Sequence, residues 1–472
     1  MLHGVVWSAV EKYSGLIIQL VITAVLARLL TPTDFGVIAI ATVLTTFFNM
    51  FTDMGVGAAI VQNQNLTQKD LDALFSFSVY VGSFLAVVFF FCSSWVASFY
   101  SNQLLTPICR ILSLNLLFAA WNMVPNALIR KAKRFKFIAI RTFTLQVICG
   151  VLAVAVAFLG GGVYALLITP VITSVGVFFI NYRQQPLGFC VKVSKGALEK
   201  VMSFSVFQFL FSFINYFSRN LDKLILGRFY SLYELGFYEK SYRLMLLPMN
   251  YVTNVITPVM HPILTSLQND FSELADKYNK ILRLLLVISF PMGAFLYYSA
   301  EDIIMIMFGN QWGAAVPVFK ILALSLPLQM ILSTTGAIYQ AANRTKWMFY
   351  GGLLNTCITV LGFILAAVFY HGINAMAWAW DITLFLNSIN SFAILYLLVL
   401  KKTMAPLLKS FVYPIVCTCA IVLVLGLLEI MDINLPYFID GVMKFLICFL
   451  LMIGTLQLSG VYDLRRIIKK RK

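Results

Sequence analysis

Two groups of charged and tyrosine side chains interrupt apolar stretches of this 472-residue chain. Their members are Tyr216, Arg219, Asp222 and Lys223 in the first group, and Tyr238, Glu239, Lys240, Tyr242 and Arg243 in the second. In a helix, positions 216, 219 and 223 share one face, and position 222 borders it. The bases outnumber the acids, which suits a phosphate or pyrophosphate group, because arginine binds its oxygens with paired hydrogen bonds and lysine adds point charge.

The same residues also allow a structural interpretation, which the sequence leaves open. Glu239 and Arg243 stand four positions apart and can pair with each other, and Lys240 can extend to the membrane interface. In the first interpretation, the rings of Tyr216, Tyr238 and Tyr242 offer surfaces on which sugars stack. Two further candidates for a cationic site are Arg28 and Arg110, although each alone is more typical of a side chain that reaches the interface.

The elements that must position these residues are transmembrane helices. The chain is 61% hydrophobic and 11% charged, whereas soluble domains have about 45–50% apolar and about 25% charged residues. A helix needs about 20 apolar residues to cross the hydrocarbon core, and about fourteen such runs predict an all-α polytopic membrane protein. The runs lie near residues 5–30, 36–61, 73–99, 104–129, 138–159, 163–182, 203–229, 236–264, 281–308, 315–340, 347–370, 373–400, 409–430 and 437–460.

The net charge of +16 follows the pattern of membrane loops. With a cytoplasmic N-terminus, most of the 35 Lys and Arg fall on the cytoplasmic side, as the positive-inside rule requires. We therefore expect both termini in the cytoplasm, no nucleic-acid partner, and contact between the basic tail at 465–472 and anionic membrane lipids.

Two stretches two hundred residues apart read like copies. Leu26–Gly36 and Leu226–Gly236 each place an Arg at the end of an apolar run, then a short link, an acid and a Gly. The similarity continues at 62–70 with 268–276, and at 162–165 with 372–375. Six helices separate the copies, so the repeats are parallel and share one orientation. The predicted organisation is an N-lobe at 1–185, a C-lobe with an interfacial linker at 186–405, and two further helices with the basic tail at 406–472.

Catalytic and metal-binding patterns do not emerge from the sequence. His3, His261 and His371 have no Cys or acid at ligand spacing, so we predict no metal site, and a phosphate-loop signature is missing. We expect no cofactor and no enzymatic activity. Any transport would be driven by an H+ or Na+ gradient or by substrate flux; Asp222, Glu239 and Asp381 are candidate coupling sites, although each also suits a salt bridge.

Several motifs resemble the bacterial polysaccharide transporter family, the Wzx-type flippases of the MOP superfamily, and most closely its teichuronic and colanic acid exporter branch. The similar stretches are Gly4–Ser8, Leu26–Gly36, Arg219–Lys223, Leu226–Arg228, Leu235–Tyr238, Tyr242–Leu244 and Phe308–Trp312. The resemblance implies two six-helix lobes around a cavity lined by cationic residues, and Arg219, Asp222, Lys223 and Arg243 match its motif positions. It also implies a monomer in the bacterial cytoplasmic (inner) membrane, associated with polysaccharide assembly proteins. Such a protein moves an undecaprenyl-pyrophosphate-linked oligosaccharide to the outer leaflet during polysaccharide or lipopolysaccharide biosynthesis.

Three alternatives compete with this hypothesis. A multidrug antiporter of the same superfamily would bind cationic drugs and should line its cavity with acids, whereas bases predominate here. A polysaccharide polymerase or ligase should carry a large outer loop with Arg, His and acids, and the predicted outer loops are short. A flippase for another polyprenyl-linked precursor fits the residues equally well and stays open.

Overall fold

The computed structural model describes residues 2–53, 56–63, 65–190, 196, 213, 216–217, 219–265, 267–268, 270–431 and 435–458. Over these residues the chain is built from helices and contains no strand, which confirms the predicted all-α class. The chain divides into two compact units, Met1–Gly236 and Phe237–Lys472, here called the first and second unit. The predicted domain boundaries near residues 185 and 405 stay predictions.

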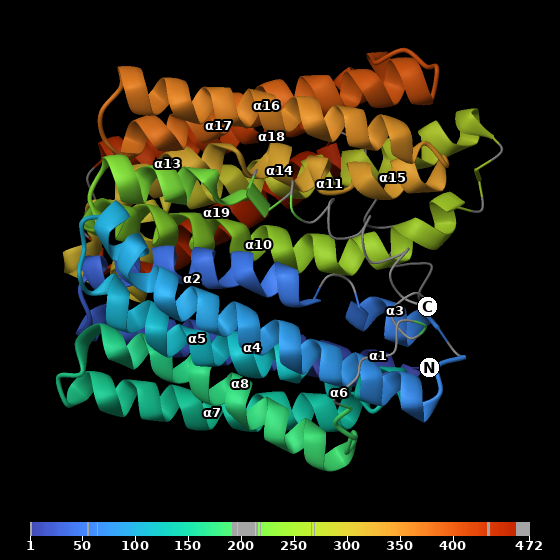
Figure 1. Ribbon diagram of the computed structural model, residues 1–472. Helices are drawn as coiled ribbons and strands as arrows, with labels where there is room; N and C mark the ends of the chain where they lie inside the picture. The colour runs from blue at the N-terminus through green and yellow to red at the C-terminus, as the bar shows by residue number, and fades with distance from the viewer. Residues whose placement is uncertain are drawn as a thin grey trace. The chain divides into compact units, whose positions relative to one another are not determined.

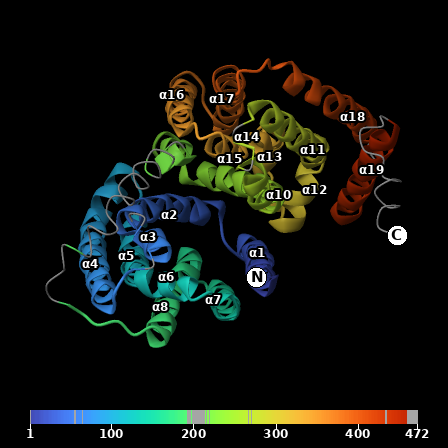
Figure 2. The same ribbon diagram turned by 90° about the vertical axis from the view of Figure 1, so that its right-hand side faces the viewer.

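The first unit contains α1 (Leu2–Leu29), α2 (Pro32–Asp53), α3 (Val56–Gln62), α4 (Gln68–Phe99), α5 (Leu105–Trp121), α6 (Met123–Lys131), α7 (Phe135–Phe158), η1 (Gly162–Tyr164) and α8 (Ala165–Gln184). Helix α4 packs along α5 (Figure 1), and α7 packs between α1 and α8 (Figure 2). Thr67 and Asp70 form a reciprocal capping box that fixes the start of α4. A left-handed Gly162 lets the chain turn between α7 and α8.

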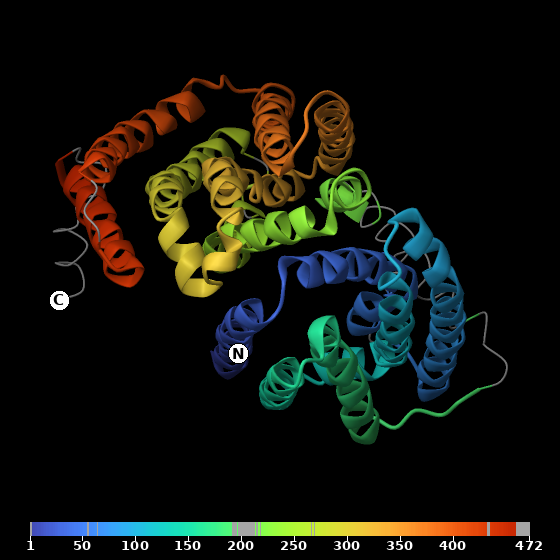
Figure 3. The ribbon, with the colours of Figure 1, turned by 90° about the vertical axis from the view of Figure 1, so that its left-hand side faces the viewer.

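Helix α10 (Leu232–Thr265) starts in the first unit and continues into the second. The other helices of the second unit are α11 (Phe271–Tyr298), α12 (Ala300–Met307), η2 (Asn310–Trp312), α13 (Ala315–Leu324), α14 (Leu326–Leu332), α15 (Thr335–Ala341), α16 (Thr345–Phe369), α17 (Ile373–Ala393), the π-helix η3 (Ile394–Val399), α18 (Ala405–Ile430) and α19 (Tyr437–Leu458). Helices α16 and α17 pack as an antiparallel pair (Figure 2). Helix α18 packs on α11 and leads to α19, which contacts α12 (Figure 3).

An ion-pair cluster joins α19 to α12. The Lys444 ammonium lies 2.7 Å from both Asp302 and Asp440, and donates to the Tyr298 carbonyl at 3.1 Å. Asp302 is 3% exposed, so this is a buried attachment for the C-terminal helices. The two helices predicted to follow the C-lobe are therefore fastened to it by charge as well as by apolar packing.

Within the described part of the chain, ten helices are long and apolar enough to cross a membrane, or up to twelve if each of two bent pairs forms one span. The bends are 42° between α5 and α6 and 47° between α13 and the helices after it. The protein is thus multi-pass, but the count of fourteen stays a prediction. Much of the predicted 203–229 helix, most of the interfacial linker at 191–200 and the basic tail at 465–472 lie outside the described residues.

The two repeat copies contact each other within the first unit. Thr31 and Asp34 cap the start of α2, and Ser231 and Glu234 cap α10 in the same way. A Cβ added to Gly36 would lie 1.7 Å from the Leu232 carbonyl oxygen, and one added to Gly236 would lie 2.0 Å from the Pro32 oxygen. Positions 32 and 232, and 36 and 236, are equivalent in the repeat, so each copy presents its glycine to the backbone of the other.

Candidate functional site

The first turns of α10 carry the charged residues that the sequence singled out in the second unit. Arg243 Nε donates to Glu239 Oε1 in an ion pair across one helical turn. The Glu239 side chain is 5% exposed and the Arg243 side chain is 52% exposed. The buried carboxylate therefore holds a side chain that is itself about half exposed. The structural pairing that the spacing predicts is present.

The side chain of Lys240, on α10, is buried in the protein interior. It is 6% exposed, and its ammonium stands 5.9 Å from the centre of the Phe308 ring. This geometry is a cation–π contact in the protein interior. The interpretation in which Lys240 extends to the membrane interface is therefore wrong for this structure, because the side chain turns inward. Its proposed contact with substrate would require this packing to open.

Two tyrosines of α10 pack into an aromatic group. The rings of Tyr238 and Tyr242 stack with centroids 6.2 Å apart, and Tyr242 meets Trp380 of α17 edge-on at 5.3 Å. Trp380 in turn stacks on Phe363 of α16 at 6.1 Å. Tyr238 is fully buried and Tyr242 is 7% exposed. In this conformation these rings are packed inside the protein and offer no open face to a sugar.

The other predicted group lies in the first unit. Asp222 is fully buried and accepts a hydrogen bond from the Lys223 amide at 2.8 Å, whereas Arg219 is exposed and Lys223 is half-buried. The hydroxyl of Tyr216 donates to the Val43 carbonyl of α2. This hydrogen bond ties the helix that carries Arg219 to α2. Arg219 thus stands exposed on a helix that is attached to α2, and Lys223 lies partly buried one turn later.

The other two basic candidates of the first unit, Arg28 and Arg110, are exposed. Arg110 of α5 donates to Ser93 of α4 at 3.3 Å, and its guanidinium lies 5.0 Å from the centre of the Phe90 ring. Arg110 is therefore engaged with the neighbouring helix, which favours the packing interpretation over ligand contact. Arg28 ends α1 as the base of its last turn, where a positive charge complements the helix dipole.

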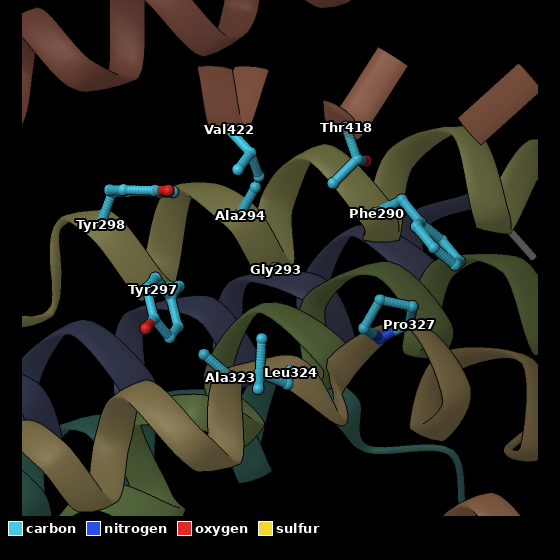
Figure 4. A pocket seen from close by; sticks show the side chains of 10 residues that line it. All are labelled: Phe290, Gly293, Ala294, Tyr297, Tyr298, Ala323, Leu324, Pro327, Thr418 and Val422. Atoms are coloured by element: carbon cyan, nitrogen blue, oxygen red, sulfur yellow. The ribbon is translucent and has the colours of Figure 1, made fainter. Parts of the chain in front are cut away.

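An apolar cavity of about 390 Å³ lies between α11, the α13–α14 bend and α18, all in the second unit (Figure 4). Its lining residues are Phe290, Gly293, Ala294, Tyr297, Tyr298, Ala323, Leu324, Pro327, Thr418 and Val422. Small residues on α11 and the bend leave the space open. The sequence does not reveal this cavity, because its lining residues come from three separate segments. This lining suits a hydrocarbon group and contains no charged side chain that could bind an ionic group.

Comparisons with known proteins agree on the kind of molecule. A family model described as polysaccharide biosynthesis protein matches residues 25–317. The chain is 27% identical over 428 residues to the teichuronic acid biosynthesis protein TuaB of Bacillus subtilis, covering 89% of this chain and 87% of TuaB. It is 23% identical over 369 residues to the lipopolysaccharide biosynthesis protein WzxC of Escherichia coli, covering 77% of this chain and 74% of WzxC.

The fold is also similar to a solved structure. The inward closed conformation of the lipid II flippase MurJ matches with a TM-score of 0.76, covering 98% of this chain and 100% of MurJ. The sequence identity is 15%, so this match shows a shared fold alone.

Proposed function

Because this chain belongs to the polysaccharide biosynthesis protein family, we propose that it is a flippase that moves a lipid-linked oligosaccharide across the bacterial cytoplasmic membrane. The observation that carries the proposal is the set of basic side chains built into helices of a multi-pass membrane protein. Arg243 is the clearest of them, since the buried Glu239 holds it while half of its side chain stays exposed. The names of TuaB and WzxC, which refer to teichuronic acid and lipopolysaccharide biosynthesis, support a saccharide substrate.

The substrate we propose is an oligosaccharide joined through pyrophosphate to a polyprenyl lipid. Pyrophosphate needs several cations. Our candidates for binding it are Arg219 and Lys223 in the first unit and Arg243 in the second, and Lys240 would become available only when its packing against Phe308 opens. We leave Arg28 and Arg110 out of this group of cations, because Arg110 packs against α4 and Arg28 stands at the C-terminal end of α1. Tyr238 and Tyr242 would hold α10 in place through their packing with Trp380. Tyr216 would hold the Arg219 helix against α2.

The parallel repeats support a transport cycle of alternating access rather than catalysis. Two equivalent lobes can open a shared path first to one side and then to the other, whereas a single active site needs no such duplication. We therefore propose a transporter with no enzymatic step. We also propose cytoplasmic termini and a monomer that works beside polysaccharide assembly proteins in the inner membrane.

Reconstitution into lipid vesicles tests this function. A fluorescent pyrophosphate-linked oligosaccharide lipid is added to both leaflets, and a membrane-impermeant glycosidase then digests what reaches the outside. We expect the purified protein to expose the inner-leaflet pool, and Arg219→Ala to slow the exposure. The matched control is Arg134→Ala, which removes an exposed arginine bound to Gln184 at 3.2 Å. An inner pool that stays protected in the presence of folded wild-type protein would overturn the proposal.

A further inference from the structure

Helix α17 carries an acidic side chain in an unusual setting. Asp381 lies inside the apolar span Ile373–Val399, and its two carboxyl oxygens each expose less than 1 Å². Neither oxygen makes a hydrogen bond of good geometry within the described part of the chain. The polar group beside it is the Ser325 hydroxyl, at the bend between α13 and α14.

The well-formed hydrogen bonds of Ser325 run to groups other than Asp381. Its hydroxyl donates to the Leu322 carbonyl at 2.6 Å, and its oxygen accepts from Gln329 Nε2 at 2.9 Å. A protonated Asp381, by contrast, has a proton of its own to offer to that oxygen. The environment therefore matches a carboxylic acid and not a carboxylate.

The charged groups on the helices packed against α17 interact with residues other than Asp381. On α13, Lys320 pairs with Glu429 at 3.4 Å and lies 5.5 Å from the centre of the Tyr297 ring. Helix α14 carries no titratable side chain. On α10, which reaches α17 through Tyr242 and Trp380, Glu239 and Arg243 pair with each other and Lys240 faces Phe308.

Helix α16 places apolar side chains beside Asp381. Hydrogen bonds from Asn387 to Thr359 and from Asn390 to Asn355 set the register of the antiparallel pair. This register puts Asp381 at the level of Leu365, while the titratable residues of α16, Cys357, Tyr350 and Lys346, lie progressively farther toward its other end. No cation of the packed helices is thus placed to balance a charge on Asp381 among the residues described.

A charged Asp inside a membrane helix is costly, and a buried carboxyl without a partner takes up a proton instead. We propose that Asp381 is a proton-binding site, which holds a proton in this conformation and releases it in the other half of a transport cycle. The inference rests on the proposed function and deepens it, because it names the coupling ion as H+ and the group that carries it.

A line of polar groups offers a route for that proton toward the C-terminal end of α17. Asn387, Asn390 and Ser391 of α17 are bonded to Thr359 and Asn355 of α16. The Asn387 Oδ1 atom is buried without a hydrogen-bond partner, six residues or about 9 Å along the helix from Asp381. These bonds also fasten the two helices together, as polar residues do in membranes. In the orientation we propose, the line leads to the cytoplasm.

Infrared difference spectroscopy on the purified, full-length protein tests proton binding directly. We expect wild-type protein to show the carbonyl band of a protonated carboxyl that disappears at high pH, and Asp381→Asn to lack it. Asp381→Glu should keep a shifted band, and the matched control Asp276→Asn, which changes an exposed acid of α11, should leave it unchanged. A band that persists in Asp381→Asn would overturn the proposal.

Transport in vesicles under a pH gradient tests coupling. With one proton per cycle, a gradient of one pH unit can bias the wild-type distribution of the fluorescent pyrophosphate-linked lipid by up to about tenfold. We expect Asp381→Asn, which imitates the protonated state, to flip the lipid without responding to the gradient. A gradient response equal to that of wild type would refute coupling through Asp381. A wild-type protein that moves no lipid at all would instead refute the proposed function, while the infrared band still decides proton binding.

Discussion

Replacing Gly36 by alanine should force the two repeat copies apart at their point of contact. The added Cβ would lie 1.7 Å from the Leu232 oxygen, whereas real Cβ contacts are essentially never shorter than 3.0 Å. The atom that it meets belongs to the backbone, so no side-chain rotation can relieve the overlap. The segments must therefore separate by about 1.3 Å, the difference between these two distances.

The size of the effect follows from what overpacking costs in a close-packed interior. Forcing a methyl group into such a contact costs about 1–3 kcal/mol. If the cost applies only to the conformation in which the segments touch, its population falls by roughly 5- to 150-fold relative to separated conformations. Gly236→Ala should act in the same way, since its Cβ would lie 2.0 Å from the Pro32 oxygen.

Distance measurements between spin labels at positions 33 and 233, which are equivalent in the repeat, give the assay. We expect Gly36→Ala to shift the distribution to longer distances. The matched control is Gly352→Ala in α16, where a Cβ meets nothing within 4 Å. That change should leave the distances unchanged and stabilise its helix slightly, because alanine is the better helix former. Identical distributions and melting temperatures for Gly36→Ala and Gly352→Ala would refute the reasoning.

Two further predictions concern charged groups. Lys444→Met should lower the free energy of unfolding by about 3–5 kcal/mol, because it leaves the buried Asp302 carboxylate without its ammonium partner. In a thermal melt in detergent, adding Asp302→Asn should recover part of this loss. Equal melting temperatures for Lys444→Met and wild type would contradict the prediction. Arg219→Ala should slow transport at an unchanged melting temperature because Arg219 is exposed, whereas Arg243→Ala should also destabilise the fold by about 1–3 kcal/mol, since it strips the ion pair from buried Glu239. Equal melting temperatures for these two variants would refute the anchoring role of Glu239.

Much of the architecture could be predicted because it depends on local properties. Apolar runs long enough to span a bilayer predict helices whatever they pack against. The family resemblance is confirmed by the match to the polysaccharide biosynthesis protein family over residues 25–317. The number of spans could not be settled in the same way. Bends after Trp121 and at Ser325 divide apolar runs that look continuous in the sequence.

Less of the candidate site could be predicted from the sequence, because its geometry depends on tertiary contacts. The spacing of Glu239 and Arg243 predicted their pairing, because both lie on one helix. The inward turn of Lys240 onto Phe308 and the burial of Tyr238 depend on partners far along the chain, which helical spacing does not reveal. The contact of Gly36 with Leu232 is of the same kind. The sequence shows that the copies are related, and only the three-dimensional structure shows that they touch.

The most direct test of the account compares two lipids in the same vesicles. Both carry the same oligosaccharide and polyprenyl chain, but one has the pyrophosphate link and the other has an uncharged link. We predict that wild-type protein exposes the pyrophosphate lipid to an impermeant glycosidase much faster than the uncharged lipid, and that Arg219→Ala removes most of the difference. Equal rates for the two lipids with wild-type protein would contradict recognition of the pyrophosphate by the basic side chains.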